Sequence, residues 1–97
     1  MLPKNRRPVH PGEVIREEYL KPLGLTQQQL ANALGITRVR INEIILGKRS
    51  VTPDTAFRLS KYFNTTPDFW INLQMNVDMW DTLQRHKKEY DNIQSVA

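Results

Sequence analysis

The side chains best suited to direct chemistry lie between positions 36 and 50. Ile41, Ile44 and Ile45 recur there at helical spacing, so that once they face a core the other side chains of the segment stay at the surface. Those outward residues are Thr37, Arg38, Val39, Arg40, Asn42 and Glu43. Guanidinium and amide groups at the N-terminal end of a helix suit phosphate oxygens and the edges of bases. The segment therefore predicts a surface that binds a polyanion.

The charge distribution agrees with this prediction. The 97-residue chain has a formal net charge of +4. Residues 36–50 contain four basic residues and one acidic residue, and residues 1–10 contain three basic residues and no acidic one. Clustering of the excess in two short stretches is typical of a protein that contacts nucleic acid. Ordinary scatter of charge in a small protein is the alternative explanation.

The elements that must position these side chains all read as helices, because no segment alternates as a strand does. After an extended arm over residues 1–9, His10-Pro11-Gly12-Glu13 begins a helix that Pro22 and Gly24 end. Thr26 and Gln29 form a capping box for a second helix, which Gly35 ends at positive φ. The predicted fold is all-α with five helices.

The remaining helices follow the same capping pattern. Thr37 caps the third helix, which stops at Gly47, and Thr52 with Pro53 begins the fourth. The fifth helix starts after Thr66 and runs from about residue 67 towards residue 90. We expect one domain over residues 10–91 and a frayed tail over residues 92–97. The predicted inward residues of helices two to four are Leu30, Ala31, Leu34, Ile41, Ile44, Ile45, Ala56, Leu59, Tyr62 and Phe63.

The second and third helices together have the pattern of a helix-turn-helix. Ala31 is small where two helices would cross closely, Gly35 permits a sharp turn, and Ile36 fills the space beneath it. In such a motif the second helix is presented to the DNA major groove. Simple packing of a helical hairpin within a bundle is the alternative for these apolar positions.

The last helix has a wide apolar stripe. Phe69, Leu73, Val77 and Trp80 share one face, and Trp70, Met75 and Met79 widen it beyond what one small core needs. We interpret the excess as a two-fold dimer interface, unless the helix simply wraps its own domain. The predicted interface residues are Trp70, Leu73, Val77 and Trp80.

Several other classes of protein are disfavoured. There is no cysteine, and the two histidines, His10 and His86, are far apart, so we expect no metal site and no cofactor. Neither histidine has a serine or aspartate at the spacing of a nucleophile and its base, so we expect no enzyme. No apolar run could span a membrane and no secretory signal is present, which predicts a cytoplasmic protein.

Longer strings of residues show a family resemblance. They are His10-Pro11-Gly12-Glu13-Val14-Ile15-Arg16-Glu17-Glu18, residues 22–31, residues 40–44, residues 52–59, and Thr66-Pro67-Asp68-Phe69-Trp70-Ile71-Asn72-Leu73-Gln74. With these strings the chain resembles the HigA/VapI family of antitoxins, within the phage-repressor-like (XRE) helix-turn-helix class. The likeness covers about residues 10–80.

The resemblance implies a homodimeric repressor that binds a palindromic operator in its own promoter. It also implies a protein partner, a HigB-type toxin that cleaves mRNA and is inactive while the antitoxin holds it. A stand-alone phage-type repressor without a toxin is the alternative, and a protein adaptor that binds no DNA is a third possibility.

By analogy with phage-type repressors, the residues predicted to read bases are Thr37, Arg38, Val39 and Asn42. Those predicted to contact phosphates are Thr26, Gln27, Arg40, Lys48 and Arg49. A surface salt bridge with Glu43 is the alternative for Arg40, and a contact at the rim of the core is the alternative for Val39. The arm with Lys4, Arg6 and Arg7 could reach DNA, contact a toxin, or remain disordered.

Overall fold

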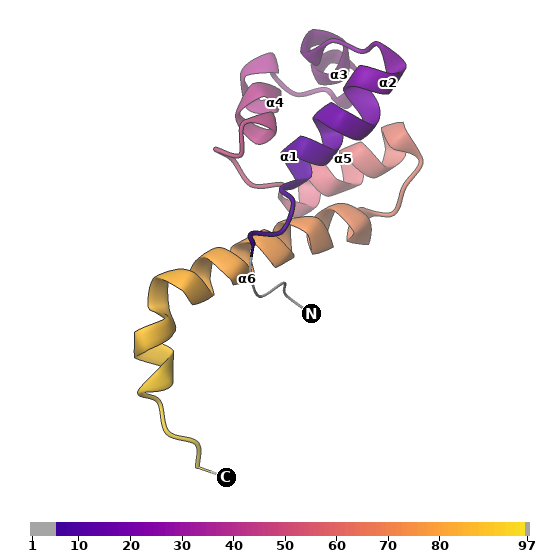
Figure 1. Cartoon of the computed structure of the whole chain (residues 1–97). Helices are drawn as coiled ribbons and strands as arrows, with labels where there is room; N and C mark the ends of the chain where they lie inside the picture. Colours follow the sequence, from indigo (N-terminus) through magenta and orange to yellow (C-terminus); the bar gives the residue numbers. More distant parts are fainter. Residues whose placement is uncertain (1–5, 97) are drawn as a thin grey trace.

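The computed structural model describes residues 6–96, and all regular structure in this range is helical, which confirms the predicted all-α class (Figure 1). The first helical stretch is continuous and comprises α1 (Pro11–Val14), the π-helical segment η1 (Ile15–Leu20) and α2 (Lys21–Leu23). It is followed by α3 (Gln27–Leu34), α4 (Arg38–Ile45), α5 (Pro53–Phe63) and α6 (Pro67–Asp91). The five helices expected from the sequence are therefore present.

Threonine side chains cap the N-termini of four of these helices, as predicted. Thr26, Thr37, Thr52 and Thr66 are in extended conformation, and each accepts a hydrogen bond from the backbone N–H three residues on. The capping box of Thr26 and Gln29 is complete, with distances of 3.0 and 2.9 Å. Local hydrogen bonding thus fixes where these helices start.

The end of the first helix differs from the prediction at one residue. The helix passes through Pro22 and ends at Gly24, which has a φ of 63°. The Lys21 N–H donates to the Arg16 carbonyl five residues back, so the turns before Pro22 are wider than in an α-helix. A proline ring collides with the carbonyl four residues back in a regular helix, and the wider turns relieve this collision.

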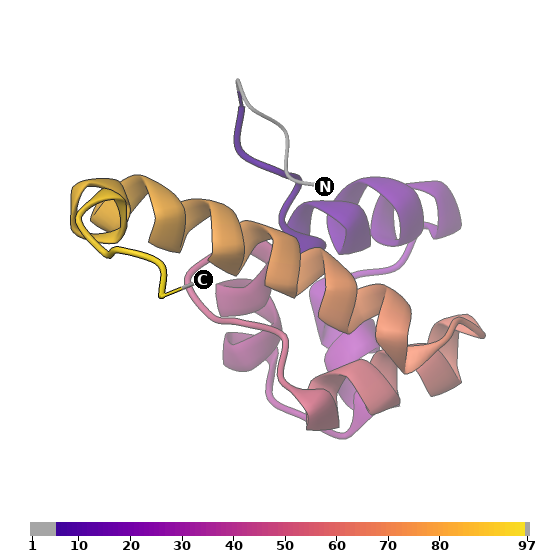
Figure 2. The ribbon, with the colours of Figure 1, turned by 90° about the horizontal axis from the view of Figure 1, so that it is seen from below.

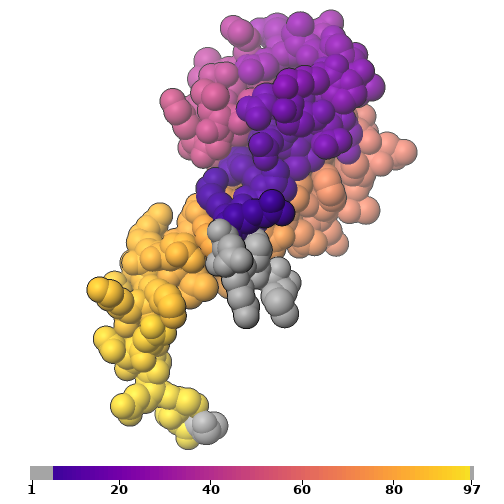
Figure 3. All heavy atoms as spheres, viewed as in Figure 1, coloured from indigo at the N-terminus to yellow at the C-terminus, as the bar shows by residue number. Residues whose placement is uncertain are grey.

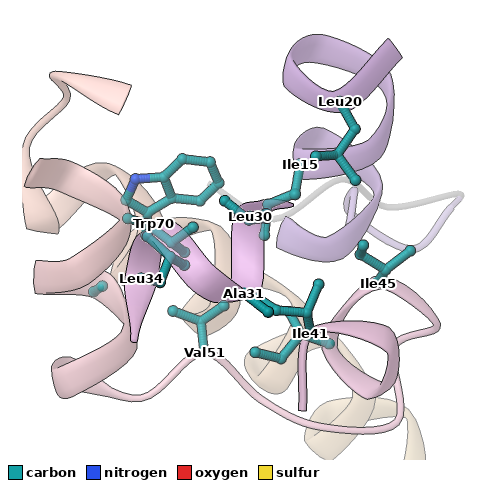
Figure 4. Close-up of a cluster of buried hydrophobic side chains, with 12 residues drawn as sticks. Ile15, Leu20, Leu30, Ala31, Leu34, Ile41, Ile45, Val51 and Trp70 are labelled. Carbon is teal, nitrogen blue, oxygen red and sulfur yellow. The ribbon is translucent and has the colours of Figure 1, made fainter. Parts of the chain in front are cut away.

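The core lies where α3, α4 and α5 meet the first helical stretch and the start of α6 (Figure 4). Most predicted inward residues are buried there, and Phe63 is partly buried. Tyr62 is the exception, because 43% of it is exposed. Side chains from outside helices two to four, above all Trp70, Ile15 and Val51, complete the core.

Helix α6 lies across the base of the other helices and continues beyond them (Figure 2). Its buried residues, Trp70, Gln74 and Val77, all belong to its N-terminal half. The C-terminal part bends and stands clear of the body, so that the molecule measures 51 × 22 × 21 Å (Figures 1 and 3). No helix in the described part of the chain is long and apolar enough to cross a membrane.

Candidate nucleic-acid interface

The face of α4 that points away from the core carries three of the four residues predicted to read bases, and the fourth, Thr37, caps the helix. Ile41, Ile44 and Ile45 are buried on the inner side, as expected. Arg38, Val39 and Asn42 line one shallow hollow on the outer side, and Thr37 is exposed at the helix start. Val39 is 69% exposed, so the alternative of a contact at the rim of the core is wrong. An apolar methyl pair between a guanidinium and an amide matches what the edges of bases present in the major groove.

The turn before α4 fixes how this face is presented. Gly35 has a φ of 71°, the left-handed conformation that was predicted for it. The Ile36 N–H then donates to the Ala31 carbonyl at 3.1 Å, and Ala31 is fully buried where α3 and α4 lie side by side. The geometry is that of a helix-turn-helix, with α4 as the second helix on the outside of the domain (Figure 1).

A second glycine, whose role the sequence did not reveal, seats the other end of α4. A Cβ on Gly12 would lie 2.0 Å from the carbonyl oxygen of Ile44 and 2.8 Å from the Cα of Ile45. The backbone of α1 therefore approaches the backbone of α4 more closely than any side chain would allow. The His10-Pro11-Gly12 string could have suggested such an approach. Glycine lowers the stability of a helix, so a glycine within one indicates a close contact that a side chain would block.

Two predicted phosphate contacts lie at the start of α3. The Thr26 hydroxyl is exposed and accepts from the Gln29 N–H, so it already serves as the helix cap. Gln27 is the first residue of α3, and its side-chain oxygen is buried without a hydrogen-bond donor. The amide nitrogen of Gln27 is then the end of the side chain that can donate to a ligand.

Arg40, predicted as a phosphate contact, is turned away from this face, and its role toward DNA stays a prediction. Its guanidinium points to α5, where Nη2 donates to Thr55 Oγ1 at 2.6 Å and lies 3.6 Å from Asp54 Oδ2. Its side chain is 28% exposed. The alternative pair with Glu43 is wrong, since Glu43 accepts from Arg49 instead, at 2.9 Å. The sequence alone does not show which carboxylate pairs with Arg40, because a long side chain can reach residues both near and far along the chain.

The segment after α4 retains cationic groups at the surface. Lys48 is exposed and forms no salt bridge within the described residues. Arg49 donates from Nε and Nη2 to one oxygen of Glu43, and its side chain is half exposed. The backbone N–H groups of Lys48 and Arg49 both donate to the Glu43 carbonyl, and these bonds hold the segment against the end of α4.

The arm is attached to α6 by one of its arginines. Arg7 forms two hydrogen bonds of 2.8 Å with the Asp81 carboxylate, and this pairing holds the pKa of Asp81 below its usual range. Arg6 is exposed, whereas Lys4 lies outside the described residues, as does most of the arm that was predicted to be flexible. His10, at the end of the arm, caps α1 by accepting from the Gly12 N–H at 2.9 Å.

The predicted dimer residues divide into two groups. Trp70 and Val77 are 0% and 1% exposed within their own domain, and the Trp70 indole N–H donates to Thr65 Oγ1 at 2.8 Å. These two are core residues, which corrects their prediction as interface residues. Leu73 and Trp80 are partly buried, and the uncovered apolar side chains of α6 are instead Phe69, Met75, Met79, Leu83 and Tyr90.

The exposed face of α4, the turn at Gly35 that joins α3 to α4, and the cations at the surface together define a helix-turn-helix protein. Residues 17–70 match the helix-turn-helix family (HTH_3). The chain is 49% identical over 77 residues to virulence-associated protein I of Dichelobacter nodosus, covering 78% of this chain and 71% of that protein. It is 39% identical to antitoxin HigA-1 of Vibrio cholerae serotype O1, covering 92% of this chain and 84% of that protein.

A solved structure is similar over the whole length. Antitoxin GraA in complex with its operator superposes with a TM-score of 0.88 at 39% identity, covering 100% of this chain and 99% of that one. The chain belongs to the helix-turn-helix family, in the group that contains the HigA antitoxins and virulence-associated protein I.

Proposed function

We propose that this chain is the antitoxin of a toxin–antitoxin pair and that it represses its own operon. As a homodimer it binds a palindromic operator, and it neutralises an mRNA-cleaving toxin of the HigB type. The observation that carries the DNA-binding part is the outer face of α4, where Arg38, Val39 and Asn42 are uncovered above a buried isoleucine face. A relative whose structure contains its operator shares this fold over its full length.

Recognition divides between side chains that read bases and groups that set the register. Arg38 donates both arms of its guanidinium to a guanine, and Val39 contacts a thymine methyl. Asn42 and Thr37 reach the neighbouring base edges. Gln27, Thr26, Lys48 and Arg49 contact phosphates, which position the protein without reading sequence.

Dimerisation supplies the second half-site. The uncovered apolar residues of α6, with Met75 and Met79 at their centre, pack against the same residues of a second copy. Two α4 helices spaced ~34 Å apart would then read two half-sites one DNA turn apart. A single copy would bind weakly and mainly through charge.

Operator binding is tested with the purified protein and its own upstream DNA, by fluorescence anisotropy at two salt concentrations with random duplex as competitor. We expect the upstream site to bind ~10³-fold or more tightly than random DNA. Equal affinity for both, with a steep dependence on salt, would contradict sequence-specific repression.

The toxin partner is tested at the gene. We expect a basic reading frame of about 90–110 residues directly beside this one, whose expression arrests growth and whose product co-purifies with this chain. Restored growth on co-expression of both proteins supports neutralisation. Operator binding without such a neighbour would favour the stand-alone repressor instead.

A further inference from the structure

The first turn of α4 is joined to α5 by a polar cluster, which we call the α4–α5 clamp and define as Arg40, Asp54, Thr55 and Arg58. Arg40 Nη2 donates to Thr55 Oγ1 at 2.6 Å. Thr55 is fully buried, and its hydroxyl also lies 3.2 Å from Thr52 Oγ1, the cap of α5. The contact therefore runs from the recognition helix into the first turn of α5.

The clamp also reaches the helix before the turn. Arg58 Nε donates to Asp54 Oδ2 at 3.0 Å, and the same oxygen lies 3.6 Å from the Arg40 guanidinium. Arg58 Nη1 donates to the Leu34 carbonyl at 2.7 Å, at the C-terminal end of α3. Two guanidinium groups around one carboxylate thus connect the end of α3, the start of α4 and the start of α5.

The two ends of α4 are held by different means. At the C-terminal end, Ile44 and Ile45 are buried and the backbone of Gly12 packs directly against them. In the first turn, Arg38 and Val39 point to solvent, and the first buried side chain is Ile41. Arg40 is the residue of that turn whose side chain bonds another helix.

We propose that Arg40, through Thr55 and Asp54, is a positioning residue that sets the orientation of the base-reading turn. This inference rests on the proposed function, because it concerns how Arg38, Val39 and Asn42 meet base edges. Direct readout needs two hydrogen bonds in a fixed geometry, so that a small rotation of the turn costs contacts with the correct base. Contacts with phosphates tolerate such a rotation, because they are made by side chains at other positions, outside this turn.

Three possible roles of Arg40 give three different results. A phosphate contact would, when lost, weaken binding to all sequences alike and lower the salt slope by about 1. A purely structural role would lower the folded fraction, which reduces both affinities by the same factor. A positioning role lowers the affinity for the operator and leaves the affinity for random duplex nearly unchanged. The ratio of the two affinities therefore separates the roles.

The sharpest variant is Thr55→Val, which removes the hydroxyl at nearly constant volume. Thr55 is buried and cannot touch DNA, so its effect on base choice passes through the partners of its hydroxyl, which are Arg40 on α4 and Thr52 at the start of α5. We expect the operator-to-random affinity ratio to fall about tenfold or more, at an unchanged salt slope. Thr55→Ser keeps the hydroxyl and should keep the ratio within about twofold of the wild type.

Arg40→Lys provides the second measurement, since it keeps the charge but not the planar guanidinium. We expect a fall in the ratio similar to that of Thr55→Val. Arg16→Ala is the control, because Arg16 is a partly exposed arginine on η1 whose salt bridges within residues 6–96 are with Glu13 and Glu17, and because it is not among the predicted DNA contacts. It should change neither affinity.

The outcomes separate this inference from the function on which it rests. If the wild type prefers its operator and Thr55→Val keeps that preference, the positioning role is overturned and the proposed function stands. The positioning role is also overturned if Arg40→Lys keeps the ratio. If the wild type itself shows no preference for the operator, the proposed DNA reading fails, and the inference fails with it.

Discussion

Helices α4 and α6 both bury one face in the same core, and they differ in what the other face exposes. The exposed face of α4 carries Arg38, Val39 and Asn42, so that a single valine lies among hydrogen-bonding groups. Such a face needs a ligand that supplies both charge and hydrogen-bond acceptors. Helix α4 spans Arg38–Ile45, and all of it lies against the domain.

The exposed side of α6 carries a row of apolar side chains in its middle part, among polar residues. Met75 and Met79 are each more than half exposed, Leu83 is 39% exposed, and beyond Val77 no residue of the helix is buried. A face of this kind is stabilised by another apolar surface rather than by a polyanion. The comparison shows that one small domain presents two chemically different surfaces, a cationic, hydrogen-bonding one on α4 and an apolar one on α6, so changes on each should be measurable separately.

The largest effect is expected beneath α4, from Gly12→Ala. The added methyl would collide with the Ile44 carbonyl, and backbone atoms cannot move aside as a flexible side chain can. We expect the free energy of unfolding to fall by about 3 kcal/mol or more, measured by urea denaturation. Gly24→Ala is the matched control, because nothing lies within 4 Å of its Cβ position and only its left-handed backbone is strained. An equal loss in both variants would mean that the close approach of α1 and α4 is unimportant.

Arg38→Ala tests the exposed face of α4 alone. We expect a loss of roughly 1–3 kcal/mol of operator binding and a relaxed preference at one base position, with the unfolding free energy nearly unchanged. Anisotropy titrations with operators substituted at single positions measure both effects.

Lys48→Ala is the companion variant, which should weaken binding to every sequence alike and lower the salt slope by about 1. If Arg38→Ala weakened operator and random DNA equally, α4 would not read bases through this arginine.

Met79→Asp tests the exposed face of α6. In a two-fold dimer each subunit would bury a new carboxylate, so we expect the dimer to dissociate at least tenfold more readily, about 1.4 kcal/mol. Sedimentation equilibrium measures this, with Met79→Leu as the control that keeps an apolar side chain. Operator affinity should fall while base preference stays the same. An unchanged dimer dissociation constant would mean that the interface lies elsewhere and that the exposed face of α6 does not bind a second copy.

The smallest effect is expected at His10, which caps α1, lies beside Gly47 after α4, and feels the charges of Asp78 and Asp81 on α6. Burial of its ring lowers the pKa of His10 from its usual value of 6.5, and the charge of Arg7 acts in the same direction, while Asp78 and Asp81 oppose them. The protonated ring could no longer accept from the Gly12 N–H. Stability is therefore complete above pH 6.5 and declines as the pH falls from 6.5 towards the lower folded-state pKa.

We expect this decline to reach at most about 1 kcal/mol, the contribution of one helix cap. Urea denaturation at pH 7.5 and 5.5 measures it. His10→Asn keeps a capping side chain that does not titrate, so its profile should be flatter over this range. A decline as large in His10→Asn as in the wild type would assign the pH dependence to other groups.

Much of the fold could be read from neighbouring residues, because the signals act over three or four positions. Each threonine cap accepts from an N–H three residues on, and Gly35 takes a backbone conformation that other residues avoid. The spacing of Ile41, Ile44 and Ile45 determines which face of α4 is buried, and with it that Arg38, Val39 and Asn42 face outward.

Only the tertiary structure decided the contacts between residues far apart along the chain. The apolar stripe of α6 is wider than one core contact, so periodicity could not show that Trp70 and Val77 face inward while Met75 and Met79 remain uncovered. The packing of Gly12 against α4 and the bond from Arg40 to Thr55 depend on where whole helices meet. The sequence therefore determined the helices and the exposed face of α4 through local periodicity and hydrogen bonding. The partners of Arg40, Gly12 and Trp70 were decided by helix packing, which brings together groups that no local pattern connects.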